Sequence, residues 1–503
     1  MEGLLKQLGK PKEFWEYFIE ITKIPHCSGN EEQIREYVKK EAEKFDFQTL
    51  EDNIGNLMVK IPSESQEKLG IILQSHLDMV CEKNENSNHD FSKDPLKLKV
   101  IEMDNQDWLT AIETTLGADN GVGVAYSLAL MKKIFEGELE FPNLNLNLLF
   151  TVTEEDGFFG AFQIEKEMMP GQYLINLDSE QYDMVTIGSA GFLITSLEIK
   201  AKSTKIEKLE ETYVPIQVKL TGLRGGHSGV EIHEGRANAI KLIIKLLWKL
   251  NKAFQIYING IDGGKRLNAI PRESKALFFV KHNEYSIVMD KIKELEADFI
   301  DDYDGIEDNI QIKAYKLNQN EVKNNVFEKK FQDKFLSVLY LIPNGSISMH
   351  PRISDLVFTS SNFASIASRK SRIKVNISQR SLKDLSQTEV SDKIIELFNI
   401  AELDFKAKKM GGFGIWKPNF KSVLLNYTKK IFKDKFDREI TVRALHAGLE
   451  PGVLVEKFDI DAISIGPNME NCHSPDERLN LKSSKLFWDF LITLLSKASE
   501  NLS

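Results

Sequence analysis

A histidine and a carboxylate stand two residues apart where a short apolar run of the sequence ends. The run from Gly70 to Gln74 has the pattern of a buried strand, and His76 and Asp78 follow it. Positions i and i+2 of an extended chain project from the same face, so the imidazole and the carboxylate should lie side by side. This pair is typical of a histidine metal ligand whose other ring nitrogen is held by a carboxylate. A buried histidine with a hydrogen-bonded partner is the alternative interpretation.

Five further residues of metal-binding type occur at comparable places along the chain. Three of them follow predicted strands, one lies in a glycine-rich bend just before an apolar helix, and one lies in a loop after a late strand. They are Glu154 and Glu155 after the strand Leu144 to Val152, Asp178 after Tyr173 to Leu177, Asp119 before the helix Ala125 to Phe135, and His473 after Ile460 to Ile465. In open α/β sheets, ligands gather beyond the carboxyl ends of the strands, so these side chains are expected to converge on His76.

Gathering several carboxylates in one place has an electrostatic consequence. Like charges raise one another's pKa values and resist ionisation unless a counter-charge is present. Two divalent cations would supply it, and histidine with carboxylates is a ligand set that zinc accepts. Two such ions about 3.5–4 Å apart can share a hydroxide and polarise a carbonyl group. Taken singly, each residue also has a structural interpretation: a helix N-cap for Asp119, an exposed pair for the glutamates, an Asx turn for Asp178 and a surface loop for His473.

Taken together, the ordered segments resemble the motifs of the M20 metallopeptidases, and within them those of the PepD-like aminoacyl-histidine dipeptidases, also known as Xaa-His or cytosolic non-specific dipeptidases. The resemblance extends over nearly the whole chain. The matching segments are Ser75–Val80, Gly117–Gly121, Thr153–Gly157, Asn176–Glu180, Gly225–His233, Leu267–Glu273 and His473–Glu477. There are two departures: Pro451 replaces the cysteine that the family usually carries, and the segment Arg380-Ser381-Leu382 lacks a second serine. Both concern substrate recognition, so the preferred dipeptide stays open.

The resemblance implies a catalytic centre with two zinc ions, for which Mn²⁺ or Co²⁺ are substitutes. One ion would be bound by His76, Asp119 and Asp178. The second would be bound by Glu155, His473 and again Asp119, which bridges the two ions. This assignment uses every residue of the predicted cluster except Glu154.

The resemblance also implies roles for two residues that bind no metal. Asp78 would orient His76. Glu154 would be the general base, which takes a proton from a metal-activated water and passes it to the departing amine. The adjacency of Glu154 and Glu155 is chemically sensible, because one carboxylate binds the metal and its neighbour is left for proton transfer.

Four residues in the middle and late parts of the chain would contact the substrate. His227 would stabilise the oxyanion, from its own subunit or across a dimer. Asn268, Arg380 and Gly448 would receive the substrate, with Arg380 pairing with its terminal carboxylate. From the residues alone, His227 lies in a glycine-rich turn and Arg380 follows a half-exposed strand, so an incidental histidine and a surface cation are the alternatives.

The order of the elements predicts an α/β fold with two domains. A chain of 503 residues exceeds what one hydrophobic core usually supports. In residues 1–191 and 411–503, strands alternate with helices, which predicts a mostly parallel central sheet with helices on both faces; by resemblance this is the zinc-peptidase-type catalytic domain. Residues 192–410 predict an inserted α+β domain, which by resemblance serves as a lid and dimerisation surface. We find no internal repeat, and the charged region 284–330 has no clear pattern.

Composition and charge exclude several other classes of protein. The net charge of −10 disfavours a general nucleic-acid binder, which needs a basic face. The N-terminus has no signal-peptide pattern, and no apolar run is long enough to span a membrane. The three cysteines are too few and too scattered for a disulfide framework, and no C-x-x-C pair supports a thiolate zinc site. A reduced, soluble, cytoplasmic protein is therefore expected.

These observations predict a dizinc metallo-dipeptidase that hydrolyses unblocked dipeptides, with Xaa-His dipeptides among its candidate substrates. A homodimer formed through the inserted domain is expected, with no nucleic-acid or membrane partner. Two alternatives remain open. One is a related M20 amidohydrolase of the aminoacylase or tripeptidase type, and the other is a catalytically silent metal-binding or assembly protein of the same fold.

Overall fold

The chain folds into two compact units, which are described separately. The computed structural model describes residues 2–62, 69–141, 144–209, 211–318, 322, 325–369 and 371–502. Unit 1 comprises Met1–Ser189, Trp416–Ala444 and Leu449–Ser503, and unit 2 comprises Ala190–Ile415 and Leu445–Gly448. The chain passes from one unit to the other after residues 189 and 415, and the short segment 445–448 also belongs to unit 2. The domain boundaries predicted from the sequence, at 191/192 and 410/411, stay a prediction.

In the described residues, the core of unit 1 is an eight-stranded sheet whose central strands are parallel. In spatial order the strands are β1 (Gln48–Glu51), β2 (Leu57–Lys60), β6 (Leu144–Thr151), β3 (Leu69–His76), β7 (Tyr173–Asn176), β23 (Asp461–Ser464), β8 (Met184–Ser189) and β22 (Thr441–Leu445). The neighbours β6, β3, β7 and β23 run parallel, whereas β1–β2, β2–β6 and β23–β8 are antiparallel pairs. Burial of β3 on both faces explains its near-continuous apolar sequence.

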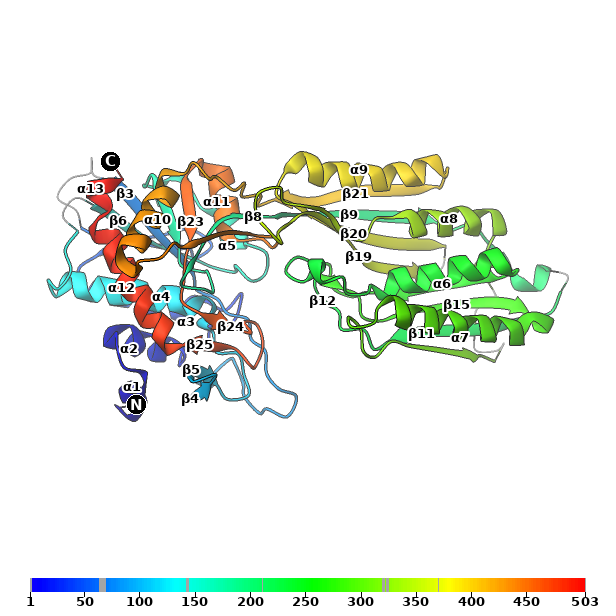
Figure 1. Ribbon diagram of the computed structural model, residues 1–503, viewed down its shortest axis with the longest axis horizontal. Coiled ribbons are helices and arrows are strands. Elements are labelled where there is room, and N and C mark those ends of the chain that lie inside the picture. Colours follow the sequence, from blue (N-terminus) through cyan, green and yellow to red (C-terminus); the bar gives the residue numbers. More distant parts are fainter. Residues whose placement is uncertain are drawn as a thin grey trace. The chain divides into compact units, whose positions relative to one another are not determined.

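Helices cover both faces of this sheet (Figure 1). Helix α4 (Ala118–Phe135) packs so closely that a Cβ atom on its Gly123 would lie 2.7 Å from the Ser75 side chain, while Glu450 of α11 (Glu450–Phe458) contacts Gln74. Because neighbouring residues of a strand face opposite sides, α4 and α11 lie on opposite faces of β3. The predicted α/β fold class is thereby confirmed.

The remaining elements of unit 1 surround this sheet. Its other helices are α1 (Glu2–Leu8), α2 (Lys12–Ile21), α3 (Glu32–Lys44), α5 (Phe159–Gln163), α10 (Val423–Phe436), α12 (Leu481–Ser496) and α13 (Ala498–Asn501). A small antiparallel sheet has the order β24 (Met469–Glu470), β25 (Arg478–Asn480), β5 (Gln106–Ala111) and β4 (Leu98–Met103).

Unit 2 is built on a large antiparallel sheet with helices packed against it (Figure 1). The spatial order of its strands is β16 (Gln311–Lys316), β11 (Tyr213–Thr221), β15 (Ser274–Lys281), β13 (Tyr257–Gly263), β19 (Val357–Arg369), β20 (Arg372–Ser381), β9 (Gly191–Lys200) and β21 (Phe405–Phe413), and β18 (Gly345–Met349) also pairs with β19. The helices are α6 (Ala239–Ala253), α7 (Tyr285–Asp302), α8 (Lys329–Leu341) and α9 (Asp384–Ile400), and the short strand pairs are β10 (Ser203–Lys205) with β17 (Asn325–Phe327) and β12 (Gly226–His227) with β14 (Ala269–Ile270). Helix α6 begins where the Asn238 side chain accepts hydrogen bonds from the N–H groups of Ile240 and Lys241, and it buries its apolar face.

The sheet of unit 2 uses one topology twice. In the first half, the chain order β11-α6-β13-β15-α7-β16 produces the spatial order β16-β11-β15-β13. In the second half, β9-α8-β19-β20-α9-β21 produces the same order, β21-β9-β20-β19, with the first half inserted between β9 and α8. The halves meet where β13 pairs antiparallel with β19. This repeat is one of topology, and the expectation of no internal repeat in the sequence stays a prediction; the charged region 284–330 supplies α7 and β16 of the first half.

Two of the three cysteines are covalently linked. Cys27 and Cys81 form a disulfide bond, whereas Cys472 is free. The expectation of a fully reduced chain is therefore wrong for the first two. The sequence separates them by 54 residues, but a parallel bridge between Cys27 and Met79 brings their segments together.

Reduction of this disulfide should destabilise unit 1. Releasing a 54-residue loop is expected to lower the free energy of unfolding by about 4 kcal/mol, because the reduced unfolded chain gains conformational freedom. Denaturant titrations with and without a dithiol reductant measure the difference. The double variant Cys27→Ser/Cys81→Ser should match the reduced protein, and Cys472→Ser serves as the control. Equal midpoints for the oxidised and reduced forms would contradict the expectation.

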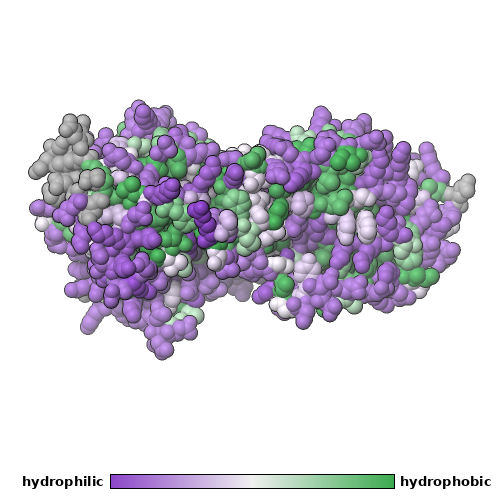
Figure 2. Space-filling model, turned by 45° about the horizontal axis from the view of Figure 1, so that its top comes forward, coloured by the Kyte–Doolittle hydropathy of each residue, from purple (hydrophilic) through white to green (hydrophobic). Residues whose placement is uncertain are grey.

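The surface and the helices are relevant to the prediction that the protein has no membrane partner. The face drawn in Figure 2 is mainly hydrophilic, with hydrophobic side chains in small patches between polar ones. Among the described residues, no helix combines the length and the apolar character that crossing a bilayer demands.

Candidate active site

The carboxyl ends of three neighbouring strands bring predicted site residues together in unit 1. Strand β3 ends at His76, the loop after β6 carries Glu154 and Glu155, and Asp178 follows β7. Because β6, β3 and β7 are adjacent and parallel, these ends lie at one edge of the sheet. Two more predicted ligands reach this edge from other elements. Asp119 lies at the start of α4, and His473 lies in the loop between β24 and β25.

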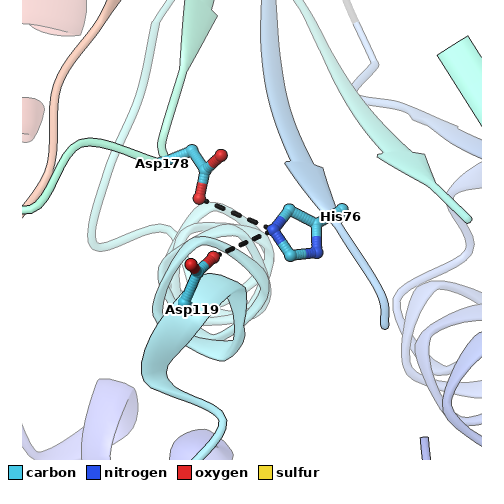
Figure 3. Close-up of side chains that lie close together, drawn as sticks. All are labelled: His76, Asp119 and Asp178. Carbon is cyan, nitrogen blue, oxygen red and sulfur yellow. Dashed lines mark hydrogen bonds and ion pairs between the residues drawn. The ribbon is translucent and has the colours of Figure 1, made fainter. Parts of the chain in front are cut away.

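His76 faces two carboxylates with one ring nitrogen. Its Nε2 atom lies 3.0 Å from Oδ1 of Asp119 and 3.6 Å from Oδ1 of Asp178. Figure 3 shows both carboxylates pointing at this nitrogen, one from the start of α4 and one from the loop after β7. The three residues are those predicted to hold the first metal ion.

Asp119 faces a second imidazole with its other oxygen. The Nε2 atom of His473 lies 3.1 Å from Oδ2 of Asp119 and 2.9 Å from Oε1 of Glu155. Each oxygen of Asp119 thus belongs to a different group of side chains. This is the arrangement that a bridging ligand requires.

The spacing and chemistry of these atoms fit two divalent ions. Ligand atoms that are each about 2.0–2.1 Å from a tetrahedral zinc ion lie about 3.3 Å from one another. The four nitrogen–oxygen distances between the predicted ligands range from 2.9 to 3.6 Å. Imidazole nitrogen with carboxylate oxygen suits zinc and also manganese or cobalt. Two further groups have ligand atoms within 4.8 Å of one another: His76 with Glu154 and Glu155, and Asp119 with Glu180 and Cys472. The second of these was not predicted.

Asp78 connects the histidine ligand to the glutamate loop. The Nδ1 atom of His76 lies 2.9 Å from the main-chain carbonyl oxygen of Asp78 and 3.5 Å from its carboxylate. The carboxylate accepts hydrogen bonds from the N–H groups of Glu154 and Glu155, at 2.9 and 3.1 Å, and from the Ser28 hydroxyl at 2.8 Å. Asp78 is therefore placed to orient His76 through its main chain and to hold the glutamate loop through its side chain.

Glu477 holds the bend that carries Asp119, a role that the sequence analysis missed. Its carboxylate accepts hydrogen bonds from four successive N–H groups, those of residues 116–119, at 2.7 to 3.2 Å. The next residue, Asn120, donates to Oδ1 of Asp178 and to the carbonyl of Leu177, both at 2.8 Å. The only sequence signal for Glu477 was its place at the end of the His473 motif.

Replacing Glu477 by alanine should weaken both the fold and the metal site. Four N–H groups, three of them buried and one partly buried, would lose their acceptor. Since an unpaired buried group costs about 1–3 kcal/mol, we expect a loss of about 3 kcal/mol or more in the free energy of unfolding. Denaturant titration measures this loss. Asp476→Ala, at the exposed neighbouring position, is the control. Equal stability of the two variants would refute the holding role.

Three carboxyl groups of the site, those of Glu154, Glu155 and Asp178, resist ionisation. Burial raises the pKa of Glu154 well above its usual value, and the nearby charge of Glu155 adds to this effect. Burial and the charge of Asp119 likewise raise the pKa values of Asp178 and Glu155. Burial opposes ionisation of Asp119 too, but its hydrogen bonds with His473 and His76 prevail and lower its pKa.

The two imidazoles respond in the opposite direction. Burial disfavours the charged form of His76, but the charges of Glu154 and Asp178 prevail and raise its pKa well above the usual value. Burial also opposes the protonation of His473, and its hydrogen bonds with Asp119 and Glu155 outweigh that effect and raise its pKa to about 12. The cluster therefore contains more carboxyl groups than its two imidazoles can balance in charge. Divalent cations stabilise such an environment.

The predicted substrate residues lie in unit 2, where three of them are neighbours. His227 pairs with Ala269 between β12 and β14, and the N–H of Ser228 donates to the carbonyl of Asn268 at 2.8 Å. Nη2 of Arg380 lies 3.3 Å from Nε2 of His227, and the guanidinium stacks 4.6 Å from the centre of the Phe192 ring. Arg380 is buried, contrary to its alternative interpretation as a surface cation, and burial lowers its pKa to about 10.

The segment that contains Gly448 belongs to the same neighbourhood of unit 2. A Cβ atom on Gly229 would lie 2.6 Å from the carbonyl oxygen of His446 and 3.1 Å from Nε of Arg380. Nε2 of His446 lies 2.7 Å from the Ser360 hydroxyl. The late segment 445–448 therefore packs beside the loop that follows His227.

The chain is similar to known peptidases. Residues 218–306 match the peptidase dimerisation domain of the M20 type, and residues 56–220 match peptidase family M28. The chain is 30% identical to the cytosol non-specific dipeptidase of Escherichia coli strain K12 over 498 residues, which cover 98% of this chain and 99% of that protein.

The chain is also similar to solved structures of peptidases. The aminoacylhistidine dipeptidase from Vibrio alginolyticus has a TM-score of 0.79 and 30% sequence identity, over 97% of this chain and 96% of the other. A tripeptidase from Staphylococcus aureus shares the fold with a TM-score of 0.59 at 14% identity, over 97% and 98% of the two chains. Given the identity to a dipeptidase over almost the full length of both chains, this chain belongs to the M20 family of metallopeptidases.

Proposed function

We propose that this protein is a metal-dependent dipeptidase that hydrolyses the peptide bond of dipeptides with free termini. The observation that carries the proposal is the convergence of four ligand residues from separate segments on Asp119, with the carboxyl group of Glu154 beside them. The E. coli and Vibrio relatives, which are named as dipeptidases, support the same substrate class.

The two groups of ligands around Asp119 suit a pair of zinc ions. His76 and Asp178 would hold one ion, Glu155 and His473 the other, and Asp119 both. When bound, such ions act as Lewis acids toward a carbonyl group and make water acidic enough to serve as a nucleophile near neutral pH.

Glu154 is the proposed general base. It is buried beside the ligands. Its main-chain N–H donates a hydrogen bond to Asp78, and because this contact does not use the side chain, the carboxylate remains available for proton transfer. It would take a proton from the attacking water and give it to the departing amine. His227 would donate from Nε2 to the oxyanion, since its Nδ1 atom already accepts from the N–H groups of Gly229 and Val230 at 3.3 and 3.1 Å.

Arg380 is the proposed partner of the substrate's terminal carboxylate, and Asn268 and Gly448 are proposed to contact the substrate as well. Replacing Arg380 by methionine should raise KM for dipeptides roughly 10- to 100-fold, because a hydrogen-bonded ion pair contributes about 1.5–3 kcal/mol. KM for the matching dipeptide amides should change little. Arg372→Met, at an exposed position of the same strand, is the control. An equal change in KM for acids and amides would refute the assignment.

Association and location follow the same relatives. The match of residues 218–306 to a dimerisation domain supports a homodimer formed through unit 2, although the contact between His227 and Arg380 is made within one chain. Light scattering across a dilution series tests the dimer. The name of the E. coli relative supports a cytoplasmic location. Disulfide bonds are rare in that compartment. Counting the free thiols of this protein in fresh lysate therefore tests both the location and the Cys27–Cys81 bond.

A substrate panel tests the proposed activity directly. The protein is stripped of metal with a chelator and assayed with and without zinc against dipeptides (Xaa-His dipeptides among them), tripeptides and N-acetyl amino acids. We expect zinc-dependent turnover of dipeptides alone. Preference for N-acetyl amino acids or tripeptides would favour the related amidohydrolases, and zinc binding without turnover would favour a silent binding protein.

A further inference from the structure

Glu450 is a buried carboxyl group close to the metal-binding edge of unit 1, and the proposed reaction gives it no role. It is the first residue of α11, and its side chain is fully buried. Taking a charged carboxylate out of water costs several kcal/mol, and an amide or apolar side chain would avoid that cost. The presence of a carboxyl group at this position therefore needs an explanation.

One oxygen of Glu450 connects the strands of the site. Oε2 accepts hydrogen bonds from Nε2 of Gln74 at 2.5 Å and from the hydroxyl of Thr151 at 2.6 Å. Oε1 of Gln74 accepts in turn from Nδ2 of Asn176 at 2.6 Å. These partners are buried and lie on β3, β6 and β7, the three strands whose ends carry the site.

The partners of Glu450 stand directly behind the predicted ligands. Gln74 and Asn176 are opposite each other in the β3–β7 register, and each is two residues before a ligand, His76 and Asp178 respectively. Thr151 is the register partner of His76 in the β3–β6 ladder. A shift of any one strand end would therefore break a hydrogen bond in this network and misplace a ligand.

We propose that Glu450 is a positioning residue for the metal centre, which aligns the ends of β3, β6 and β7 through Gln74, Thr151 and Asn176. The proposal takes the metal pair from the proposed function but does not depend on the substrate. Supporting partners of this kind orient metal ligands and tune their affinity.

The network does not require a charge on Glu450. Burial raises its pKa to about 7, and Oε1 has no hydrogen-bond partner among the described residues. A protonated carboxyl group still offers Oε2 as an acceptor, and so does the carbonyl oxygen of a glutamine. Glutamine at position 450 should therefore keep the network intact. Leucine has a similar volume but no acceptor, so it should disrupt the network.

Calorimetric zinc titration of the metal-free protein, together with kcat, KM and melting temperature, tests the proposal. Glu450→Leu should lower the zinc affinity and kcat roughly 10- to 100-fold each, with KM within about twofold. Glu450→Gln should stay within about threefold of the wild type in both quantities. Thr151→Val, which removes one donor and keeps the shape, should shift zinc affinity in the same direction as Glu450→Leu and serves if that variant fails to fold.

The matched control is Glu41→Leu. Glu41 is also a buried carboxylate of unit 1, on α3, and it accepts a hydrogen bond from Tyr17 at 3.2 Å. In the sequence it is distant from the predicted ligands. It should lower the melting temperature and leave zinc affinity and kcat unchanged. If Glu450→Leu and Thr151→Val behaved like Glu41→Leu, or if Glu450→Gln were as impaired as Glu450→Leu, the proposal would be overturned. Because zinc affinity is measured without substrate, a wild type that cleaves no dipeptide would refute the proposed function and leave this comparison decisive.

Discussion

Replacing Glu154 by alanine should abolish most of the turnover while both metal ions stay bound. General acid–base catalysis by a positioned side chain contributes about 10²- to 10⁴-fold, so kcat for dipeptides should fall by that factor. The predicted ligands Glu155, His76 and Asp119 are untouched, and the N–H of residue 154 can still donate to Asp78 as it does at 2.9 Å. Metal content per chain and kcat, measured on the same preparation, check both halves of the expectation.

The neighbouring residue Asp156 provides the control for this variant. It lies two positions from Glu154 in the same loop, and its side chain is exposed. Asp156→Ala should keep full metal content and turnover. Near-normal turnover of Glu154→Ala would remove Glu154 as the base, and loss of metal from that variant would instead reassign it as a ligand.

Replacing Asp119 by alanine should remove metal as well as activity. Its two oxygens face His76 at 3.0 Å and His473 at 3.1 Å, so one truncation takes a ligand from both proposed ions. We expect fewer than two ions per chain after dialysis against dilute zinc. The loss of kcat/KM should exceed the roughly 10- to 100-fold effect typical of residues that only support a ligand.

The truncation at Asp119 needs a control for the loss of one negative charge. Asp107 on β5 is an exposed aspartate of the same unit, and Asp107→Ala should retain two ions and full activity. Elemental analysis after dialysis measures the ions. Two ions per chain in Asp119→Ala, together with wild-type turnover, would exclude a bridging role.

The convergence of the candidate ligands of unit 1 could be predicted because their sequence signals are local. An apolar run before His76, a glycine-rich bend at Asp119 and a strand before Asp178 can each be recognised within a few residues. The rule that carboxyl ends of parallel strands share one edge then places them together without knowledge of the other contacts. The resemblance to a known family added the division into ligands and base.

The residues that support the site could not be predicted in the same way. Glu450 contacts Gln74 across 376 positions of sequence, and Glu477 contacts the bend before Asp119 across about as many. A glutamate that accepts hydrogen bonds inside a protein looks, in sequence, the same as an exposed one. The Cys27–Cys81 bond was missed for the same reason, since proximity of two cysteines depends on how distant segments pair.

The α/β class and the residue types able to bind metal could be recognised in the sequence, because they depend on short-range periodicity and composition. Folding was needed to show which carboxylates face His76 and His473, which carboxyl groups support the site, and that unit 2 uses one topology twice. Burial and hydrogen bonding between distant segments select these partners, and both arise only in the folded chain.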